Sequence, residues 1–177
     1  TIAENFDELS GIKVAWVGDG NNVLHDLMLG AAALGMEMHY AVPKGFEPDQ
    51  NIVSRAKEIA KRKGGTIQMT NDPVEAVKDA NVVYTDVFVS MGEEDLKDKI
   101  DAFDGFQVNE ELVSNANSDY IFMHCLPAHR GEEVTDGVID SKNSVVFDQA
   151  ENRMWAQMSL LTFLIHPAAW EAFSELH

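Results

Sequence analysis

The chain has 177 residues, of which 45% are hydrophobic and 24% charged, a composition typical of a globular protein with its own core. Its net charge of −17 argues against nucleic acid and anionic membranes as partners, because lysine and arginine bind both. The single cysteine cannot form an internal disulfide, which favours a reducing compartment and predicts a cytoplasmic location. No apolar run approaches the roughly 20 residues of a membrane span. The first residues show neither an initiator methionine nor a signal-peptide pattern, so we expect the chain to be cut from a longer protein.

Strand-like apolar runs alternate with helical patterns along the chain. The predicted strands are residues 13–17, 36–42, 66–69, 81–86, 120–123 and 144–147. The predicted helices are residues 23–35, 49–63, 72–78, 109–116 and 151–165, and residues 93–101 are expected to form a solvated acidic helix face. The last long helix carries Trp155 and Met158 on its apolar side, and we expect both in the core.

This alternation predicts a fold class. Strands separated by helices form right-handed crossovers, which give a parallel sheet covered by helices. The strands are nearly continuous apolar runs, as strands buried on both faces are. We therefore expect residues 1–177 to form an α/β domain with a single doubly wound, Rossmann-like parallel sheet and helices on both faces.

Polar residues follow four of the predicted strands. The clusters are Asp19, Asn21 and Asn22; Asp86, Ser90 and Met91; His124, Cys125 and Leu126; and Asp148, Glu151, Asn152 and Arg153. Ligands of parallel sheets bind beyond the carboxyl ends of the strands, which lie at one edge. We therefore predict that the four clusters converge in one crevice.

Several of these residues also have simpler interpretations. Gly18-x-Gly20 after a strand resembles the start of a dinucleotide fingerprint, but Val23 stands where the third glycine belongs. Asn21 or Asn22 could serve only as a helix cap.

The remaining clusters leave similar alternatives. Asp86 and Ser90 could belong to a turn, or could accept hydrogen bonds from a substrate ammonium. Cys125 could be a packed thiol or part of a site. Arg153 near a helix N-terminus is disfavoured by the helix dipole, so an anion is expected to compensate it. The histidines lack metal-binding spacing, and we expect neither a metal nor a cofactor.

Taken together, these motifs identify a resemblance. Asp86-x-x-x-Ser90-Met91-Gly92, His124-Cys125-Leu126-Pro127 and Glu151-Asn152-Arg153 resemble the signatures of the ornithine carbamoyltransferases. The segment Trp-Val-Gly-Asp-Gly-Asn-Asn at residues 16–22, followed by Val-Leu-His, does so too. The resemblance spans residues 1–164 and keeps the order and spacing of the family.

The resemblance implies an activity in arginine metabolism. The family transfers the carbamoyl group of carbamoyl phosphate to L-ornithine, giving L-citrulline and phosphate, without a metal or a covalent intermediate. It implies that ornithine is bound by Asn22, Asp86, Ser90 and the backbone N–H of Met91. It also implies catalytic roles for Cys125 and Arg153. Cys125 orients or deprotonates the reacting amine, Arg153 stabilises the carbamoyl oxygen, and the Leu126 carbonyl holds the carbamoyl NH₂, so that these three residues contact carbamoyl phosphate.

The chain also departs from the family pattern. The Ser-Thr-Arg-Thr phosphate loop and the His-Pro-x-Gln motif of the first domain are absent. We therefore expect the second, ornithine-binding domain alone, with the N-terminal carbamoyl-phosphate domain missing and with little or no activity. The family is homotrimeric or higher, and its trimer is built largely through that missing domain, so the resemblance does not predict the oligomeric state of this chain. The alternatives are a non-catalytic amino-acid-binding module and a nucleotide-binding α/β module. Residues 165–177 are expected to pack on the first domain or on a neighbour.

Overall fold

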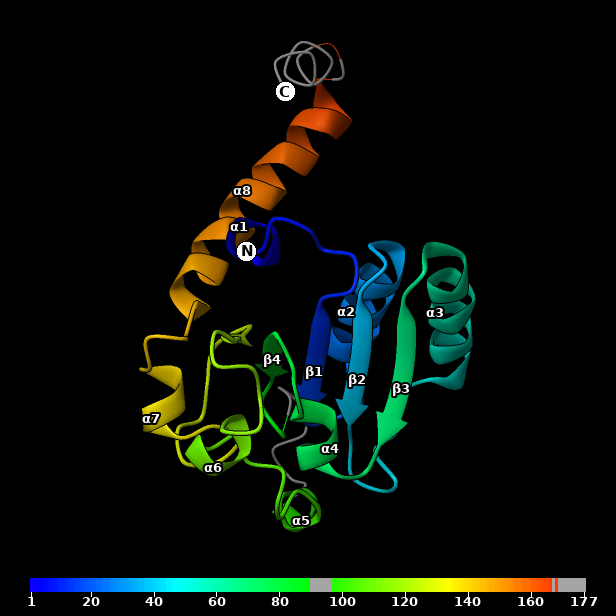
Figure 1. Cartoon of the computed structure of the whole chain (residues 1–177). Helices are drawn as coiled ribbons and strands as arrows, with labels where there is room; N and C mark the ends of the chain where they lie inside the picture. The colour runs from blue at the N-terminus through cyan, green and yellow to red at the C-terminus, as the bar shows by residue number, and fades with distance from the viewer. Residues whose placement is uncertain (90–96, 167, 169–177) are drawn as a thin grey trace.

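The computed structural model describes residues 1–89, 97–166 and 168, and contains a five-stranded sheet in the order β3-β2-β1-β4-β5 (Figure 1). The strands are β1 Lys13–Val17, β2 Glu37–Ala41, β3 Thr66–Thr70, β4 Val82–Thr85 and β5 Ile121–His124. Each neighbouring pair is parallel. The order reverses beside β1, because β2 pairs on one side of it and β4 on the other. The predicted doubly wound α/β fold is confirmed.

Helices cover both faces of this sheet. They are α1 Ile2–Asn5, α2 Asn22–Ala33, α3 Gln50–Lys63, α4 Pro73–Val77, α5 Lys97–Ala102, α6 Glu110–Val113, α7 Asp136–Ile139 and α8 Val146–Ile165. Side chains of β1 alternate between two buried clusters: Val14 and Trp16 pack with α2 and α3, whereas Ala15 and Val17 pack with α4 and α6. This alternation is the period of two expected of a strand buried on both sides.

Two glycines mark where the first crossover helices begin and end. Gly64 ends α3 in the left-handed conformation, with φ of +84°. Gly20 lies before α2, and a Cβ there would overlap the backbone at Phe46 and Pro48. The chain between β2 and α3 therefore closes directly against the turn that follows β1.

The last predicted strand, residues 144–147, is wrong. Ser144 forms one isolated parallel bridge with Phe122, and the chain is helical from Val146 onward. The N–H of Gln149 already donates to Val145 O at 2.9 Å, as a first helical turn requires. A short apolar run does not by itself distinguish a strand from the start of a helix. The helix therefore begins five residues before the predicted Glu151.

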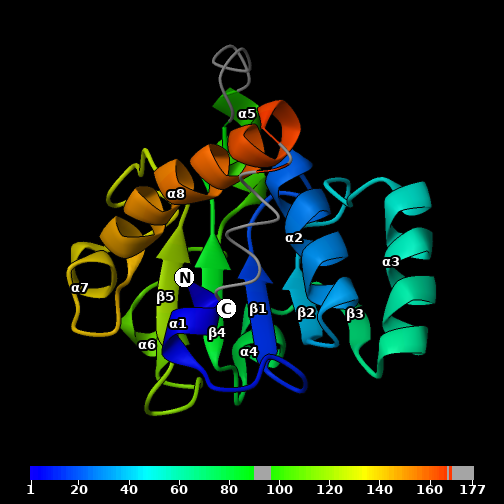
Figure 2. The same ribbon diagram turned by 90° about the horizontal axis from the view of Figure 1, so that it is seen from above.

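The predicted burial of Trp155 and Met158 is also wrong. Both side chains are 51% exposed, and Val146 is the only buried residue of α8. An apolar face is buried only where another element covers it, and α8 instead runs from the side of α7 past α1 (Figures 1 and 2). The exposed apolar residues of α8 are Phe147, Met154, Trp155, Met158, Leu160, Leu161, Phe163, Leu164 and Ile165.

Within the described ranges, no helix has the length and apolar character needed to cross a membrane. The predicted contacts of the tail fall mostly on residues 167 and 169–177, outside the described residues.

Candidate functional site

The candidate site lies where β1, β4 and β5 end side by side. Thr85 and His124 are paired as the last residues of their strands, and Thr85 Oγ1 donates to Val17 O, at the end of β1, across 2.6 Å. Thr85 and His124 are completely buried. The residue that follows each strand, Asp86 or Cys125, is thereby carried to the same edge of the sheet. Because Asn21 and Cys125 both hydrogen-bond to Asp86, three of the four predicted clusters converge as expected.

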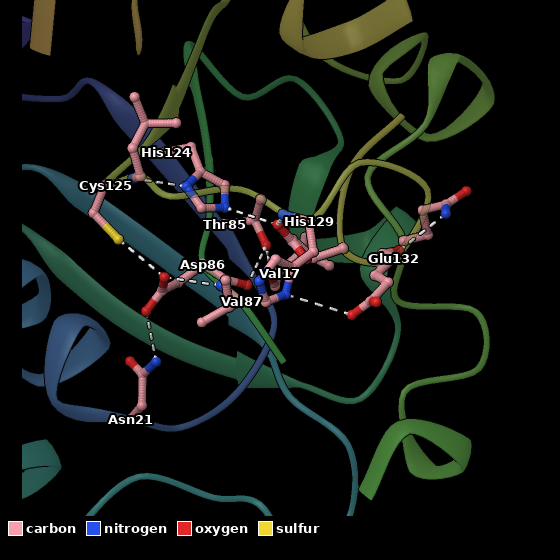
Figure 3. Close-up of polar contacts among 12 residues, drawn as sticks. Val17, Asn21, Thr85, Asp86, Val87, His124, Cys125, His129 and Glu132 are labelled. Atoms are coloured by element: carbon pink, nitrogen blue, oxygen red, sulfur yellow. Dashed lines mark hydrogen bonds and ion pairs between the residues drawn. The ribbon is translucent and has the colours of Figure 1, made fainter. Parts of the chain in front are cut away.

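Asp86 is the centre of the hydrogen bonds at this edge (Figure 3). Its Oδ1 accepts from the N–H of Val87 at 2.8 Å and from Cys125 Sγ at 2.9 Å. Its Oδ2 accepts from Asn21 Nδ2 at 2.9 Å. The side chain is 7% exposed, and all these donors are neutral. Among the described residues no salt bridge compensates the carboxylate, which makes this edge favourable for a cation.

Cys125 carries a protonated thiol. Burial, the hydrogen bond to Asp86 and the negative charge of Asp86 raise the pKa of the thiol to about 12. The geometry agrees, because a thiol that donates to a carboxylate must keep its proton. At neutral pH Cys125 is therefore a hydrogen-bonding group and not a thiolate nucleophile.

A buried pair, His124 and Glu133, supports the loop that holds Cys125. His124 Nδ1 accepts the N–H of Leu126 at 2.9 Å, which assigns the ring proton to Nε2. Nε2 then donates to Glu133 Oε1 across 3.2 Å, and both side chains are 0% exposed. The N–H of His129 donates to the same oxygen at 2.6 Å, while Glu133 Oε2 has no hydrogen-bond partner in the described part of the chain. His124 and Glu133 thus fix the course of residues 124–133.

Leu126 has an unusual backbone. Its φ is +53°, a region that non-glycine residues seldom adopt, and the Leu126–Pro127 peptide is cis. The hydrogen bond to His124 Nδ1 holds this conformation. Its carbonyl group is therefore presented by a backbone that a neighbouring side chain fixes in place.

Two further residues of this edge were missed by the sequence analysis. Gln149, in the first turn of α8, accepts the N–H of His124 at 3.1 Å and donates to the hydroxyl of Tyr84 at 2.7 Å. Burial raises the pKa of Tyr84, and its ring stacks on Trp16 with centroids 5.5 Å apart. A correct start for α8 would have placed Gln149 in its first turn and identified it.

The fourth predicted cluster, at residues 148–153, was expected to converge with the others, and it does not. Asn152 donates to Thr1 Oγ1 at 2.9 Å and to Glu4, so its side chain faces α1. Asp148, Glu151 and Asn152 line a cavity of about 580 Å³ together with Glu4, Asn5 and Trp155. Among the described residues, Gln149 is the residue of α8 whose side chain hydrogen-bonds to the buried strand ends.

The other predicted ligands are placed as follows. Arg153 is exposed, one helical turn after Gln149, and no hydrogen bond joins it to Asp86 or Cys125 in the described ranges. Asn22 is the exposed first residue of α2, next to the cap Asn21. Ser90 and Met91 lie outside the described residues.

A second cavity does not contain this chemistry. It measures about 740 Å³ and is lined by Phe88, Phe103, Gln107 and Glu132, among others, but not by Asp86 or Cys125. We therefore locate the candidate site from the hydrogen bonds at the strand ends and not from the cavity.

In the described part of the chain, two groups of side chains have ligand atoms within 4.8 Å of one another, close enough to hold a metal ion. They are Asp86, His124 and Cys125, and His129, Glu132 and Glu133. In the first group both ring nitrogens of His124 are already engaged, and the thiol is protonated. The absence of a metal stays a prediction.

Comparisons with known proteins agree with the fold and the motifs. The family described as Aspartate/ornithine carbamoyltransferase, Asp/Orn binding domain, matches residues 10–164. A catabolic ornithine carbamoyltransferase of Thermoplasma acidophilum is 58% identical over 166 residues, which are 93% of this chain and 54% of that protein. An anabolic one of Pyrococcus furiosus is 52% identical and is covered to 53%.

Solved structures show the same similarity. The structure of ornithine carbamoyltransferase from Pyrococcus furiosus superposes with a TM-score of 0.88 at 53% identity, covering 91% of this chain and 52% of that chain. The enzyme from Gloeobacter violaceus gives 0.84 at 46% identity, covering 90% and 53%. This chain spans about half the length of the curated relatives it matches.

Proposed function

Because this chain belongs to the aspartate/ornithine carbamoyltransferase family, as its Asp/Orn-binding domain, we propose that it binds L-ornithine beside Asp86 and Cys125. Residues 1–177 supply the ornithine-binding half of a carbamoyltransferase. Binding of carbamoyl phosphate requires the other half of the enzyme, which carries the phosphate-binding motifs of the family. The reaction of the two halves together is the formation of L-citrulline and phosphate.

One observation supports this proposal above the others. The carboxylate of Asp86 is 7% exposed and is surrounded by neutral donors in the described residues. A nearly buried charge of this kind is stabilised by an opposite charge. The α-ammonium of an amino acid supplies one, with Ser90 as the second acceptor. Asn22 and the backbone N–H of Met91 then take the α-carboxylate.

The groups at the reacting end have matching chemistry. The δ-amine of ornithine, after losing a proton, attacks the carbonyl carbon of carbamoyl phosphate. The new C–N bond forms as the C–O bond to phosphate breaks. Phosphate leaves with the electron pair and takes the second amine proton, which leaves neutral L-citrulline. Because the Cys125 thiol is protonated, it orients the amine instead of removing its proton. The Leu126 carbonyl accepts from the carbamoyl NH₂.

Arg153 is proposed to stabilise the oxyanion that develops on the carbamoyl oxygen. Arg153 lies four residues after Gln149, so both side chains project from the same face of α8. Gln149 is hydrogen-bonded at the end of β5. This shared face supports a position for Arg153 above the strand ends when the other half of the enzyme covers α8.

The chain alone is proposed to have little or no transferase activity. Neither phosphate-binding motif occurs in it, and α8 exposes apolar side chains that a second domain would cover. The homotrimeric state of the family and a reducing, cytoplasmic location are proposed for the parent enzyme only. A nucleotide-binding function is disfavoured, because the Gly20 turn is filled by the backbone at Phe46 and Pro48, where a pyrophosphate would approach.

Calorimetry tests the binding proposal. We expect heat on titration of the chain with L-ornithine and with L-norvaline, which lacks the δ-amine, and none with NAD. Asp86→Asn should weaken the binding of both amino acids at least tenfold, since a hydrogen bond to a charged group contributes about 1.5–3 kcal/mol. Asp140→Asn, at an exposed ion pair with Arg130, is the matched control and should bind as the parent chain does. If ornithine gives neither heat nor thermal stabilisation, the proposed function is wrong.

A citrulline assay tests the second part. With ornithine and carbamoyl phosphate, the chain alone should form citrulline no faster than a Cys125→Ala variant. Turnover comparable to that of a full-length relative would overturn the proposed dependence on a second domain.

A further inference from the structure

Asn21 joins the N-terminus of α2 to the carboxylate at the centre of the site. Its Oδ1 accepts the N–H groups of Val23 at 3.0 Å and Leu24 at 3.1 Å, as the cap of α2. Its Nδ2 donates to Asp86 Oδ2 at 2.9 Å (Figure 3). The amide oxygen of Asn21 therefore caps α2, and its amide nitrogen hydrogen-bonds to Asp86.

The cap fixes which way the amide faces. A flipped amide would place NH₂ against two backbone N–H groups and a carbonyl oxygen against the Asp86 carboxylate. Both contacts would be repulsive, so the orientation follows from the hydrogen bonds. The backbone of α2 thus holds the Nδ2 donor toward Asp86, and no rotation of the amide can replace it.

The two oxygens of Asp86 are held differently. Oδ1 accepts from Val87 N and from Cys125 Sγ, whereas the described residues provide Oδ2 with Asn21 alone. The torsion that sets the plane of an aspartate carboxylate is broad and weakly preferred on its own. The bond from Asn21 therefore selects the plane and directs the remaining lone pair of Oδ2.

We propose that Asn21 is a positioning residue that orients Asp86 for the α-ammonium of the substrate. This role rests on the proposed binding of ornithine and extends it to a residue that touches no reacting atom. The simpler interpretation is that Asn21 only caps α2. The positioning role and the capping role predict different ligand affinities for a variant that keeps the cap but lacks the Nδ2 donor.

Asn21→Ser is the variant that separates them, because serine also caps helices but cannot reach Asp86 with an amide. We expect this variant to bind L-ornithine and L-norvaline about tenfold more weakly, which is the loss expected for one hydrogen bond to a charged group. Binding of 5-aminovalerate, which lacks the α-ammonium, should not change. Asp72→Ala removes the equivalent cap of α4, where Asp72 Oδ1 accepts from Val74 N, and should leave all three ligands unaffected.

A double-mutant cycle gives the second readout. In an Asp86→Asn background, Asn21→Ser should no longer change ornithine affinity, because the carboxylate that it orients is gone. Equal weakening in both backgrounds would show that Asn21 acts through the helix and would overturn the proposal. If Asn21→Ser does not fold, Asn21→Thr also keeps a capping hydroxyl while lacking the Nδ2 donor.

The outcomes separate this inference from the proposed function. If the parent chain binds ornithine and Asn21→Ser binds it equally well, only the role of Asn21 is wrong. If the parent chain binds no ornithine, crystal structures of the parent and of Asn21→Ser still decide. A rotated Asp86 carboxylate in the variant supports the positioning role, and an unchanged one refutes it.

Discussion

The thiol of Cys125 donates a hydrogen bond to Asp86 Oδ1 across 2.9 Å, so the only thiol of the chain and the buried carboxylate of Asp86 form one unit. This bond joins the residue after β5 to the residue after β4. It keeps the thiol protonated, while the carboxylate has no opposite charge to compensate it among the described residues.

Alkylation tests the state of the thiol. Only the thiolate reacts, and a pKa of about 12 leaves Cys125 protonated through pH 7–9, where an ordinary thiol ionises. We expect iodoacetamide to modify the folded chain at least tenfold more slowly than the urea-unfolded chain at pH 8. The folded rate should still rise with pH above 9, because the raised pKa moves ionisation upward.

Asp86→Asn is the informative comparison for that experiment. It removes the negative charge that raises the thiol pKa, so it should speed alkylation of the folded chain. Asp140→Asn, in an exposed ion pair, should have no effect. Fast alkylation of the unmodified folded chain at pH 8 would contradict the protonated-thiol assignment.

The second prediction concerns the buried pair His124–Glu133. Glu133→Ala leaves His124 Nε2–H and the N–H of His129 without an acceptor and opens a cavity, so it should lower the free energy of unfolding by about 2–4 kcal/mol. Glu133→Gln keeps one acceptor oxygen and should lose less, about 1 kcal/mol. Urea denaturation measures both. Glu132→Gln, at a half-exposed side chain, should stay within about 0.5 kcal/mol of the parent and serves as the control.

The third prediction contrasts two glycines. Gly20→Ala places a methyl group against the backbone at Phe46 and Pro48, and should destabilise the chain by about 1–3 kcal/mol. Gly30 lies within α2, and a Cβ there meets nothing within 4 Å. Gly30→Ala should therefore stabilise by about 0.5–1 kcal/mol, since alanine favours the helix. Thermal unfolding should show opposite shifts, and a shift of the same sign for both would contradict the close approach at Gly20.

The fourth prediction concerns the exposed face of α8. Met158→Ala should cost less than about 1 kcal/mol of unfolding free energy in this chain, because the side chain is 51% exposed. Phe122→Ala, at a fully buried ring of β5, should cost about 3–5 kcal/mol. Both are compared by urea denaturation. A large loss for Met158→Ala would mean that α8 is covered in solution.

The sequence pattern was sufficient to predict the five strands of the sheet and the convergence of the clusters that contain Asn21, Asp86 and Cys125. Strand ends of a parallel sheet lie at one edge whatever the details of packing, so Asp86 and Cys125 could be placed together from the pattern alone. The motifs around them likewise identified the family, because they keep both residue type and spacing. Periodicity did not place the start of α8, since the apolar run at residues 144–147 fits a strand and a helix equally.

The hydrogen bonds that join these residues could not be predicted before the packing of the loops was known. No pattern in the sequence pairs His124 with Glu133, Asn21 with Asp86 or Gln149 with Tyr84, because each contact depends on loops whose course is set by packing. Burial of an apolar helical face likewise depends on what lies against it. The apolar pattern of α8 therefore predicted that Trp155 and Met158 are buried, whereas no described element covers them.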